Sequence, residues 1–326
     1  MEFELIDILQ QRIAVTRADV RLGIGDDAAI LAPPAGHELV VTTDTLVAGV
    51  HFPAATSARD LGWKALAVNL SDLAAMGATP AWALLALTLP EPDRTFVGHF
   101  ADGFGELAAQ HRVALVGGDT TRGPLSVTVV VHGFVQPGRA LRRDGARVGD
   151  QVFVTGSLGD AAAGLRCLDR RDPQAASLFN APPDTRESLL ARLLRPTPRI
   201  AAGAALRDVA SACIDVSDGL LADLGHIAAR SRVGIEVEAH DLPASSALLA
   251  LFDANQRLAL QAAGGDDYEL AFTAPAARAA EVLRDLASLG SGATRIGRVV
   301  DGQGVRLLDA DGTELVLHRR GWNHFA

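Results

Sequence analysis

The chain has 326 residues, 48% of them hydrophobic, and a formal net charge of −9. This length suggests about two domains with sizeable cores, and the negative charge argues against nucleic acid or an anionic membrane as a partner, because both need a basic face. The longest apolar run, residues 81–89, is far shorter than the ~20 residues that span a bilayer. The acidic N-terminus does not resemble a secretory signal, and the two cysteines form no CxxC motif. We therefore expect a cytoplasmic protein.

Hydrophobic periodicity and β-branched runs predict the elements of the first half of the chain. The run 38–47 (ELVVTTDTLV) is predicted to be a strand that ends near Asp44. Alanine and leucine at helical spacing favour a helix at residues 58–78. The other predicted elements are helices at 3–13 and 94–111 and strands at 81–90, 113–119 and 125–135.

A segment rich in glycine, proline and charge, residues 136–151, is predicted to connect two domains, 1–137 and 138–326. Helices and strands alternate on both sides of it, which indicates α/β or α+β domains whose sheets are mixed or antiparallel. DGQG (301–304) and DADG (309–312) are predicted hairpin turns. The strands expected in the second half start at residues 151, 212, 234, 268 and 294.

Aspartates recur in loops beside glycine and threonine, in the motifs GDD (25–27), TTDT (42–45), GGDTTRG (117–123), DVSDG (215–219) and GGDDYE (264–269). For any single motif, helix capping or an Asx-turn is the more common explanation. The DVSDG motif could be only the N-cap of the helix that follows. Asp72 differs, because it lies within an apolar helical stretch, where an unpaired carboxylate is costly. So many motifs in one chain make capping alone an insufficient explanation.

Carboxylate and hydroxyl oxygens are the ligands that hard cations prefer, Mg²⁺ above all. The adjacent Asp26 and Asp27 repel one another unless a cation lies nearby, so we expect at least one of them to hold metal. The chain contains no GxxxxGK[ST] motif and no protein-kinase HRD or DFG set. Any phosphate ligand would therefore be held through metal ions, backbone N–H groups and a few arginines.

Seven motifs, taken together and in their order along the chain, closely resemble those of the thiamine-monophosphate kinases. They are GIGDDAAI, TTDTLVAGVHF, KALAVNLSDLAAMGATPAW, GGDTTRGPLSVT, VTGSLGDAAAGL, DVSDGLLADLGHI and GGDDYEL. These enzymes belong to the superfamily of aminoimidazole ribonucleotide synthetase and selenophosphate synthetase. The resemblance covers nearly the whole chain. It implies an N-terminal α/β domain whose mixed sheet pairs in a homodimer, and a C-terminal α/β domain that completes the active-site cleft.

The resemblance also implies site residues. Several Mg²⁺ ions would be bound around the phosphates of ATP by Asp27, Thr42, Thr43, Asp44, Asp72, Asp119, Asp215 and Asp218. ATP would contact Gly118, Asp119, Arg143 and Ser217, and thiamine monophosphate would contact His51, Asp266 and Trp322.

Three of these assignments have a plausible structural alternative, and a fourth residue departs from the family's motif. His51 lies among apolar residues and could belong to the core, Trp322 could anchor the C-terminal tail, and Arg143 could be an exposed linker charge. The family commonly has GGEDYEL where this chain has GGDDYEL, so Asp266 is one methylene shorter than the usual glutamate.

The implied reaction is transfer of the γ-phosphoryl group of ATP to thiamine monophosphate. Its acceptor is a phosphate monoester whose second pKa is about 6, so it is already largely a dianion at neutral pH and needs no strong general base. Two alternatives stay open: another ATP-using member of the superfamily, or a non-catalytic nucleotide- or metal-binding homologue. A selenophosphate synthetase is disfavoured because no cysteine lies near the N-terminus. The synthetase of purine synthesis is disfavoured by the stretch NLSDLAAMGATPAW.

Overall fold

The computed structural model describes residues 2–168 and 181–323, and the chain divides into two compact units. The first comprises Met1–Leu73 and Ala78–Ala140, and the second comprises Ala74–Gly77 and Leu141–Ala326. The division after Ala140 lies inside the linker expected at residues 136–151. The short piece Ala74–Gly77 groups with the second unit because Ala74 and Ala75 belong to one of its hydrophobic clusters.

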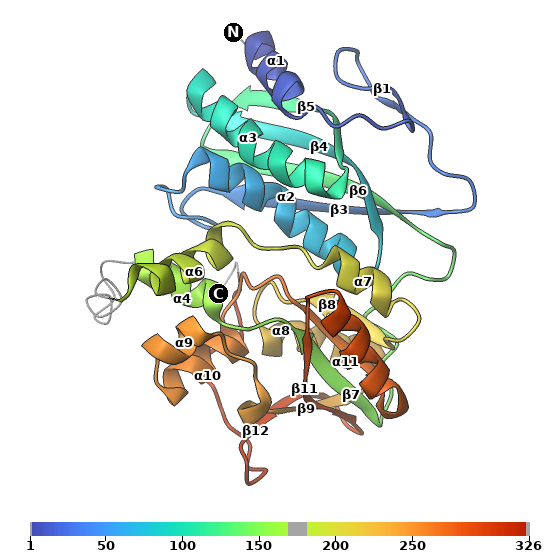
Figure 1. Ribbon diagram of the computed structural model, residues 1–326, viewed down its shortest axis with the longest axis vertical. Helices are drawn as coiled ribbons and strands as arrows, with labels where there is room; N and C mark the ends of the chain where they lie inside the picture. The colour runs from blue at the N-terminus through green and yellow to red at the C-terminus, as the bar shows by residue number, and fades with distance from the viewer. Residues whose placement is uncertain (1, 169–180, 324–326) are drawn as a thin grey trace. The chain divides into compact units, whose positions relative to one another are not determined.

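The first unit is built on a four-stranded sheet in the order β3–β6–β4–β5 (Figure 1). β6 runs antiparallel to both β3 and β4, whereas β4 and β5 are parallel, so the sheet is mixed, as predicted. The elements are α1 (Glu2–Arg12), β1 (Val20–Leu22), β2 (Ile30–Leu31), β3 (Glu38–Val47), α2 (Ala58–Ala75), β4 (Thr79–Leu89), α3 (Arg94–His111), β5 (Ala114–Arg122) and β6 (Ser126–Val135).

Helices α2 and α3 cover one face of this sheet (Figure 1). Asp93 caps α3 by accepting the N–H of Phe96 at 3.0 Å, and Arg112 ends the helix in the left-handed conformation, with φ 54°. These caps explain why the observed helix has the predicted bounds. The two helices approach closely at Gly103, where a Cβ would lie 1.8 Å from the carbonyl oxygen of Arg59.

The opposite face of the sheet is only partly covered. Trp82 packs there edge-to-face on Phe134, with ring centroids 5.0 Å apart, against Val20 and Leu31 of the β1–β2 ribbon. The register of β3 and β4 against β6 places Leu39 and Val41 on this same face, at the edge of the sheet. Their exposed fractions are 49% and 53%, so the uncovered part of the face is apolar.

The second unit is built on a six-stranded sheet in the order β12–β9–β11–β7–β10–β8. Its strands are β7 (Asp150–Thr155), β8 (Ala212–Asp215), β9 (Gly234–Glu238), β10 (Leu270–Pro275), β11 (Ala293–Val300) and β12 (Gly304–Leu308). Its described helices are α4 (Asp160–Leu168), α6 (Pro183–Leu194), α7 (Ile200–Leu206), α8 (Leu220–Ser231), α9 (Ser246–Leu251), α10 (Ala254–Ala263) and α11 (Ala279–Ser288), with 3₁₀ turns η1 (Ala239–Asp241) and η2 (Ala276–Arg278).

Two hydrophobic clusters form on this sheet and a third lies among the helices. In the first, α8 packs on strand residues such as Ile214 and Val237. In the second, α7 and α11 pack on Phe153 and Phe272, whose rings stack 5.3 Å apart. The third joins α4, α6, α9 and α10. Alternating side chains of one strand enter different clusters, which is why Val152 and Phe153 are both fully buried.

One of the two predicted hairpins is wrong. Residues 301–304 connect β11 to β12, but these strands do not pair with each other, because both pair with β9, on its two sides. Residues 309–312 do form a tight turn, closed by the N–H of Asp309 donating to the carbonyl of Thr313 at 3.0 Å. Along the described parts of the chain, no helix combines the length and the apolar composition needed to cross a bilayer.

Candidate active site

The residues expected to bind metal, ATP and substrate fall into two groups, one in each unit. The first unit carries Asp27, Thr42, Thr43, Asp44, His51, Asp72, Gly118 and Asp119, and the second carries Arg143, Asp215, Ser217, Asp218, Asp266 and Trp322.

In the first unit, strand β3 and helix α2 bring Thr42 and Asp72 together. The hydroxyl of Thr42 donates a hydrogen bond of 2.5 Å to Oδ2 of Asp72. Thr42 and Asp44 pair with the fully buried Val131 and Val129, so both face the helix side of the sheet. The strand alternation places Thr43 on the opposite face, where it is exposed. Of the threonine pair, the side chain of Thr42 alone lies on the same face as Asp44.

The two adjacent aspartates of the N-terminal loop differ in their contacts. Oδ1 of Asp26 accepts the backbone N–H of Asp27 at 2.9 Å, which is a local turn contact. Both side chains are exposed. Asp26 therefore shapes the loop, and Asp27 is the better candidate of the two for a metal ligand.

Strand β5 presents Asp119 directly after a residue that must be glycine. Gly118 has φ 154°, and a Cβ there would lie 1.8 Å from the carbonyl oxygen of Leu85 on β4. Any side chain would thus push β5 away from its neighbour, and with it the exposed Asp119. His51 is anchored in a different way: its Nδ1 accepts the backbone N–H of Val47 at 3.0 Å, so a neutral ring carries its proton on Nε2.

In the second unit, five of the predicted residues meet at the turn formed by residues 215–219. Asp215 ends β8 and is 3% exposed. The N–H of Asp266 donates to the carbonyl of Ser217, and the N–H of Trp322 donates to the carbonyl of Asp218, both at 2.9 Å. Backbone hydrogen bonds thus hold the loop 264–269 and the C-terminal tail against this turn.

Arg143 is placed differently. Its side chain is exposed, and its backbone carbonyl accepts the hydroxyl of Ser231 at 2.8 Å. Ser231 ends α8, whereas the 215–219 turn precedes the start of that helix. The backbone of Arg143 therefore lies at the other end of α8 from the predicted ligands.

The capping explanation of the DVSDG motif is not correct for its own aspartates. The N-cap of α8 is Gly219, and it has no side-chain cap hydrogen bond. Instead, Oδ2 of Asp223 accepts the N–H groups of residues 217, 218 and 219 from within the helix. The carboxylates of Asp215 and Asp218 are thus not needed to cap the helix. Asp223 is not among the predicted residues, although a carboxylate in the first turn of a helix is a recognisable signal.

Asp267 is a second residue of structural importance that is not among the predicted ones. Two residues beside it, Asp266 and Tyr268, have left-handed backbone conformations, with φ 67° and 51°, which non-glycine residues adopt only when their surroundings enforce them. Asp267 itself is buried, and its carboxylate accepts the N–H of Gly159 at 2.7 Å. The phenol of Tyr268 donates to Oδ1 of Asp266 at 3.0 Å. The strained turn therefore fixes the position of Asp266.

Glu269 is the centre of a buried ion-pair cluster that no sequence motif indicates. Its side chain is fully buried and accepts hydrogen bonds from Arg192 at 2.7 Å and from Arg199 at 2.5 and 2.6 Å. The hydroxyl of Thr155 adds a further bond at 2.6 Å. The cluster joins β7, α6 and the start of α7 to the loop that carries Asp266.

Because Asp267 is buried, we expect the free energy of unfolding to depend on pH in a specific way. Burial raises its pKa to about 8, from 3.8. Between these values the folded chain holds a proton that the unfolded chain has released, so stability falls as the pH rises from about 4 to about 8. Asp267→Asn cannot titrate, and we expect its unfolding free energy to decline less from pH 5 to pH 8 than that of the wild type. Urea unfolding at both pH values measures this, and parallel profiles would contradict it.

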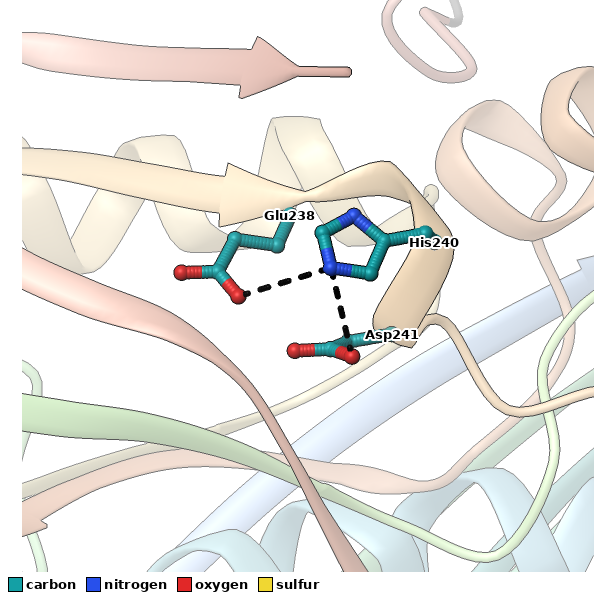
Figure 2. Close-up of side chains that lie close together, drawn as sticks. All are labelled: Glu238, His240 and Asp241. Carbon is teal, nitrogen blue, oxygen red and sulfur yellow. Dashed lines mark ion pairs between the residues drawn. The ribbon is translucent and has the colours of Figure 1, made fainter. Parts of the chain in front are cut away.

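A separate cluster of Glu238, His240 and Asp241 has the residue types of a metal site (Figure 2). Nε2 of His240 lies 4.0 Å from Glu238 and 3.7 Å from Asp241. However, Arg295 donates to the same two carboxylates at 2.9 and 3.2 Å and already compensates their charge. We therefore interpret this cluster as a network of ion pairs at the end of β9.

The donor chemistry of the predicted metal ligands fits Mg²⁺. All side-chain donors are oxygens, and the carboxylate of Asp72 lies on the same side of the sheet as Asp44, as its bond to Thr42 shows. Asp215 supplies a buried carboxylate in the second unit. Such a donor set suits the binding of metal-complexed phosphates.

Comparison with known proteins identifies the family. Residues 25–135 match the "AIR synthase related protein, N-terminal domain", and residues 147–310 match the "AIR synthase related protein, C-terminal domain". The thiamine-monophosphate kinase of Salmonella typhimurium is 47% identical over 326 residues, which cover 100% of this chain and 98% of that protein.

Solved structures agree with this match. The crystal structure of the thiamine-monophosphate kinase from Stenotrophomonas maltophilia K279a has a TM-score of 0.87 and 54% identity, and covers 96% of this chain and 98% of its own. A structure described as AaThiL complexed with AMPPCP and TMP has a TM-score of 0.78 and 35% identity, and covers 99% and 97%. Since the similarity extends over both units, the chain belongs to the thiamine-monophosphate kinase family of AIR synthase related proteins.

Proposed function

We propose that this chain catalyses the ATP-dependent phosphorylation of thiamine monophosphate to thiamine diphosphate. The observation that carries the proposal is full-length similarity, at 47% identity, to a thiamine-monophosphate kinase. A related structure has been solved with AMPPCP and TMP. This degree of similarity does not favour a different activity within the superfamily.

Residues of both units would together hold the Mg²⁺ ions. Bound Mg²⁺ would neutralise phosphate charge and align the two substrates. The residues proposed to hold the ions are Asp27, Thr42, Thr43, Asp44, Asp72, Asp119, Asp215 and Asp218. For Thr43 the backbone carbonyl is the better donor, because its side chain is on the opposite face of β3 from Thr42.

The substrates would be positioned by the remaining predicted residues. Gly118, Asp119, Arg143 and Ser217 are proposed to contact ATP, and His51, Asp266 and Trp322 to contact thiamine monophosphate. In this scheme residues 1–137 carry the metal and ATP sites and the dimer contact, and residues 138–326 complete the cleft. Asp266 is held rigidly by the 266–268 turn, which supports a contact role despite its shorter side chain.

The chemical step needs little from the protein beyond positioning. An oxygen of the acceptor phosphate attacks the γ-phosphorus of ATP, the bond to the β–γ bridging oxygen breaks, and ADP leaves. The acceptor is largely a dianion at neutral pH, so no base has to remove a proton. We therefore propose direct transfer within a ternary complex.

Steady-state kinetics test the function and the transfer step together. Initial-rate plots for ATP and thiamine monophosphate should intersect, thiamine should be a poor acceptor, and the rate should fall below about pH 6, where the acceptor gains a proton. After incubation with γ-labelled ATP alone, the denatured protein should carry no covalently bound label. Parallel plots with a stable phosphoenzyme would refute direct transfer. Absence of turnover would instead favour a non-catalytic homologue.

We also propose that the protein is a cytoplasmic homodimer that pairs through the uncovered sheet face of the first unit. Leu39 and Val41 give this face an exposed apolar edge, which is typical of an interaction surface. Sedimentation equilibrium should give twice the chain mass for the wild type and the chain mass for Val41→Arg. A monomeric wild type, or a dimeric variant, would contradict the proposed interface.

A further inference from the structure

The turn between β8 and α8 has an unusual hydrogen-bond arrangement. Oδ2 of Asp223 accepts the backbone N–H of Ser217 at 3.0 Å and those of Asp218 and Gly219 at 3.1 Å each. Three consecutive N–H groups therefore converge on one oxygen. Convergent N–H groups at the start of a helix normally form a binding site for an anion such as phosphate. Here a side chain of the same helix occupies that position.

The arrangement is not explained by electrostatic stabilisation of the fold. Asp223 is 3% exposed, and the charge of the turn that acts on it is that of Asp218, which is also negative. Burial and this neighbour both work against a charged carboxylate, whereas the three N–H groups favour it. An apolar side chain at this position would avoid the burial cost but would leave the three N–H groups without an acceptor.

The other edge of the same turn is held by segments that carry predicted substrate ligands. The carbonyl of Ser217 accepts the N–H of Asp266, and the carbonyl of Asp218 accepts the N–H of Trp322. Asp223 thus binds the N–H groups of the turn, and these two segments bind the carbonyl groups of Ser217 and Asp218. With both sides fixed, the backbone of Ser217 and Asp218 has one conformation.

We infer that Asp223 is a positioning residue for nucleotide binding: it fixes the 217–219 backbone, so that Ser217 and Asp218 present their side chains to the metal–nucleotide complex while the N–H groups stay occupied. The inference rests on the proposed function for the roles of Ser217 and Asp218. Asp223 itself does not contact substrate in this scheme. Its conservative replacement by asparagine keeps an oxygen that can accept the same N–H groups.

Three variants test whether Asp223 positions the 217–219 backbone or only contributes to the stability of the fold. Asp223→Ala removes the acceptor, and Asp223→Asn keeps one. Asp150→Ala is the matched control, because Asp150 is another buried aspartate of the second unit (5% exposed) that accepts a backbone N–H, that of Arg147 at 3.0 Å. It lies at the opposite end of β7 from Thr155, whose hydroxyl binds Glu269.

Two measurements on the purified full-length chain test the inference without relying on turnover. Hydrogen–deuterium exchange of a peptide covering residues 216–222 should be faster in Asp223→Ala and close to wild type in Asp223→Asn. Calorimetric titration with AMPPCP and Mg²⁺ should show binding weakened about tenfold or more in Asp223→Ala, the effect expected when the three N–H groups of residues 217–219 lose their acceptor. Binding should change by less than about threefold in Asp223→Asn and in Asp150→Ala.

Several outcomes would overturn the inference. It is wrong if folded Asp223→Ala binds AMPPCP like the wild type, or if Asp150→Ala weakens binding equally. Asp223→Ser, whose hydroxyl is too short to reach three N–H groups, replaces the alanine variant if that variant does not fold. If neither folds, Asp223 serves the fold as a whole and the inference fails. Failure of the wild type to phosphorylate thiamine monophosphate would refute the proposed function, whereas the exchange result would still report on the turn.

Discussion

Asp72→Asn is expected to reduce kcat/KM for phosphoryl transfer by at least about a hundredfold while the chain stays folded. A carboxylate that holds a metal ion at the transferring phosphates contributes several kcal/mol of transition-state stabilisation, and each 1.36 kcal/mol is a factor of about ten in rate. The asparagine retains an oxygen that accepts the hydroxyl of Thr42, so the bond between β3 and α2 is kept. Asp44→Asn, on the same side of the sheet, is expected to behave alike.

The same helix offers a control for this experiment. Asp60 lies in the first turn of α2 and its Oδ2 accepts the hydroxyl of Ser57 at 2.7 Å, a local contact at the start of the helix. Asp60→Asn should therefore have nearly wild-type activity. Thermal unfolding of all three variants shows whether the fold is retained. Near-wild-type turnover of Asp72→Asn at saturating Mg²⁺ would refute the metal role.

Locally encoded features of the fold could be predicted well from the sequence. Helix α3 has the expected bounds because a cap residue starts it and a left-handed residue ends it, and both act over a few positions. Strand β3 starts at Glu38 as predicted, but the predicted end near Asp44 is wrong: the strand continues to Val47, because β6 pairs with it throughout. The failed hairpin at residues 301–304 shows the limit: a turn motif does not reveal which strand will be the neighbour.

The predicted site residues and the missed ones differ in the range of their interactions. Asp72 was recognisable because a charged residue within an apolar helix is anomalous in the sequence itself. Glu269 was not, because its partners Arg192 and Arg199 lie 77 and 70 residues away and occur in a stretch with several other arginines. Asp267 likewise depends on an N–H group 108 residues distant. Such contacts exist only once the sheet has formed.

Glu269→Gln is expected to have the largest effect on stability of any single substitution considered for this protein. Its carboxylate is fully buried between Arg192 and Arg199, which are themselves only 21% and 17% exposed. Removing one partner of a buried ion pair costs about 3–5 kcal/mol, because the remaining charges stay buried without compensation. Here two guanidinium groups would be left close to each other, so the upper part of this range applies.

The measurement is thermal and urea-induced unfolding of the wild type and the variant. For a unit of this size, about 1 kcal/mol shifts Tm by about 2–4 °C, so a loss of about 4–5 kcal/mol should lower Tm by about 8–20 °C. Glu281→Gln is the control, since Glu281 pairs with Arg278 on the exposed surface of α11 and its loss should hardly change Tm.

The double variant Glu269→Gln/Arg199→Met should lose less unfolding free energy than the sum of the losses in the two single variants, because the second change removes a charge left unpaired by the first. A decrease in Tm no larger than that of the control, or strict additivity, would show that Glu269 does not compensate the two arginines.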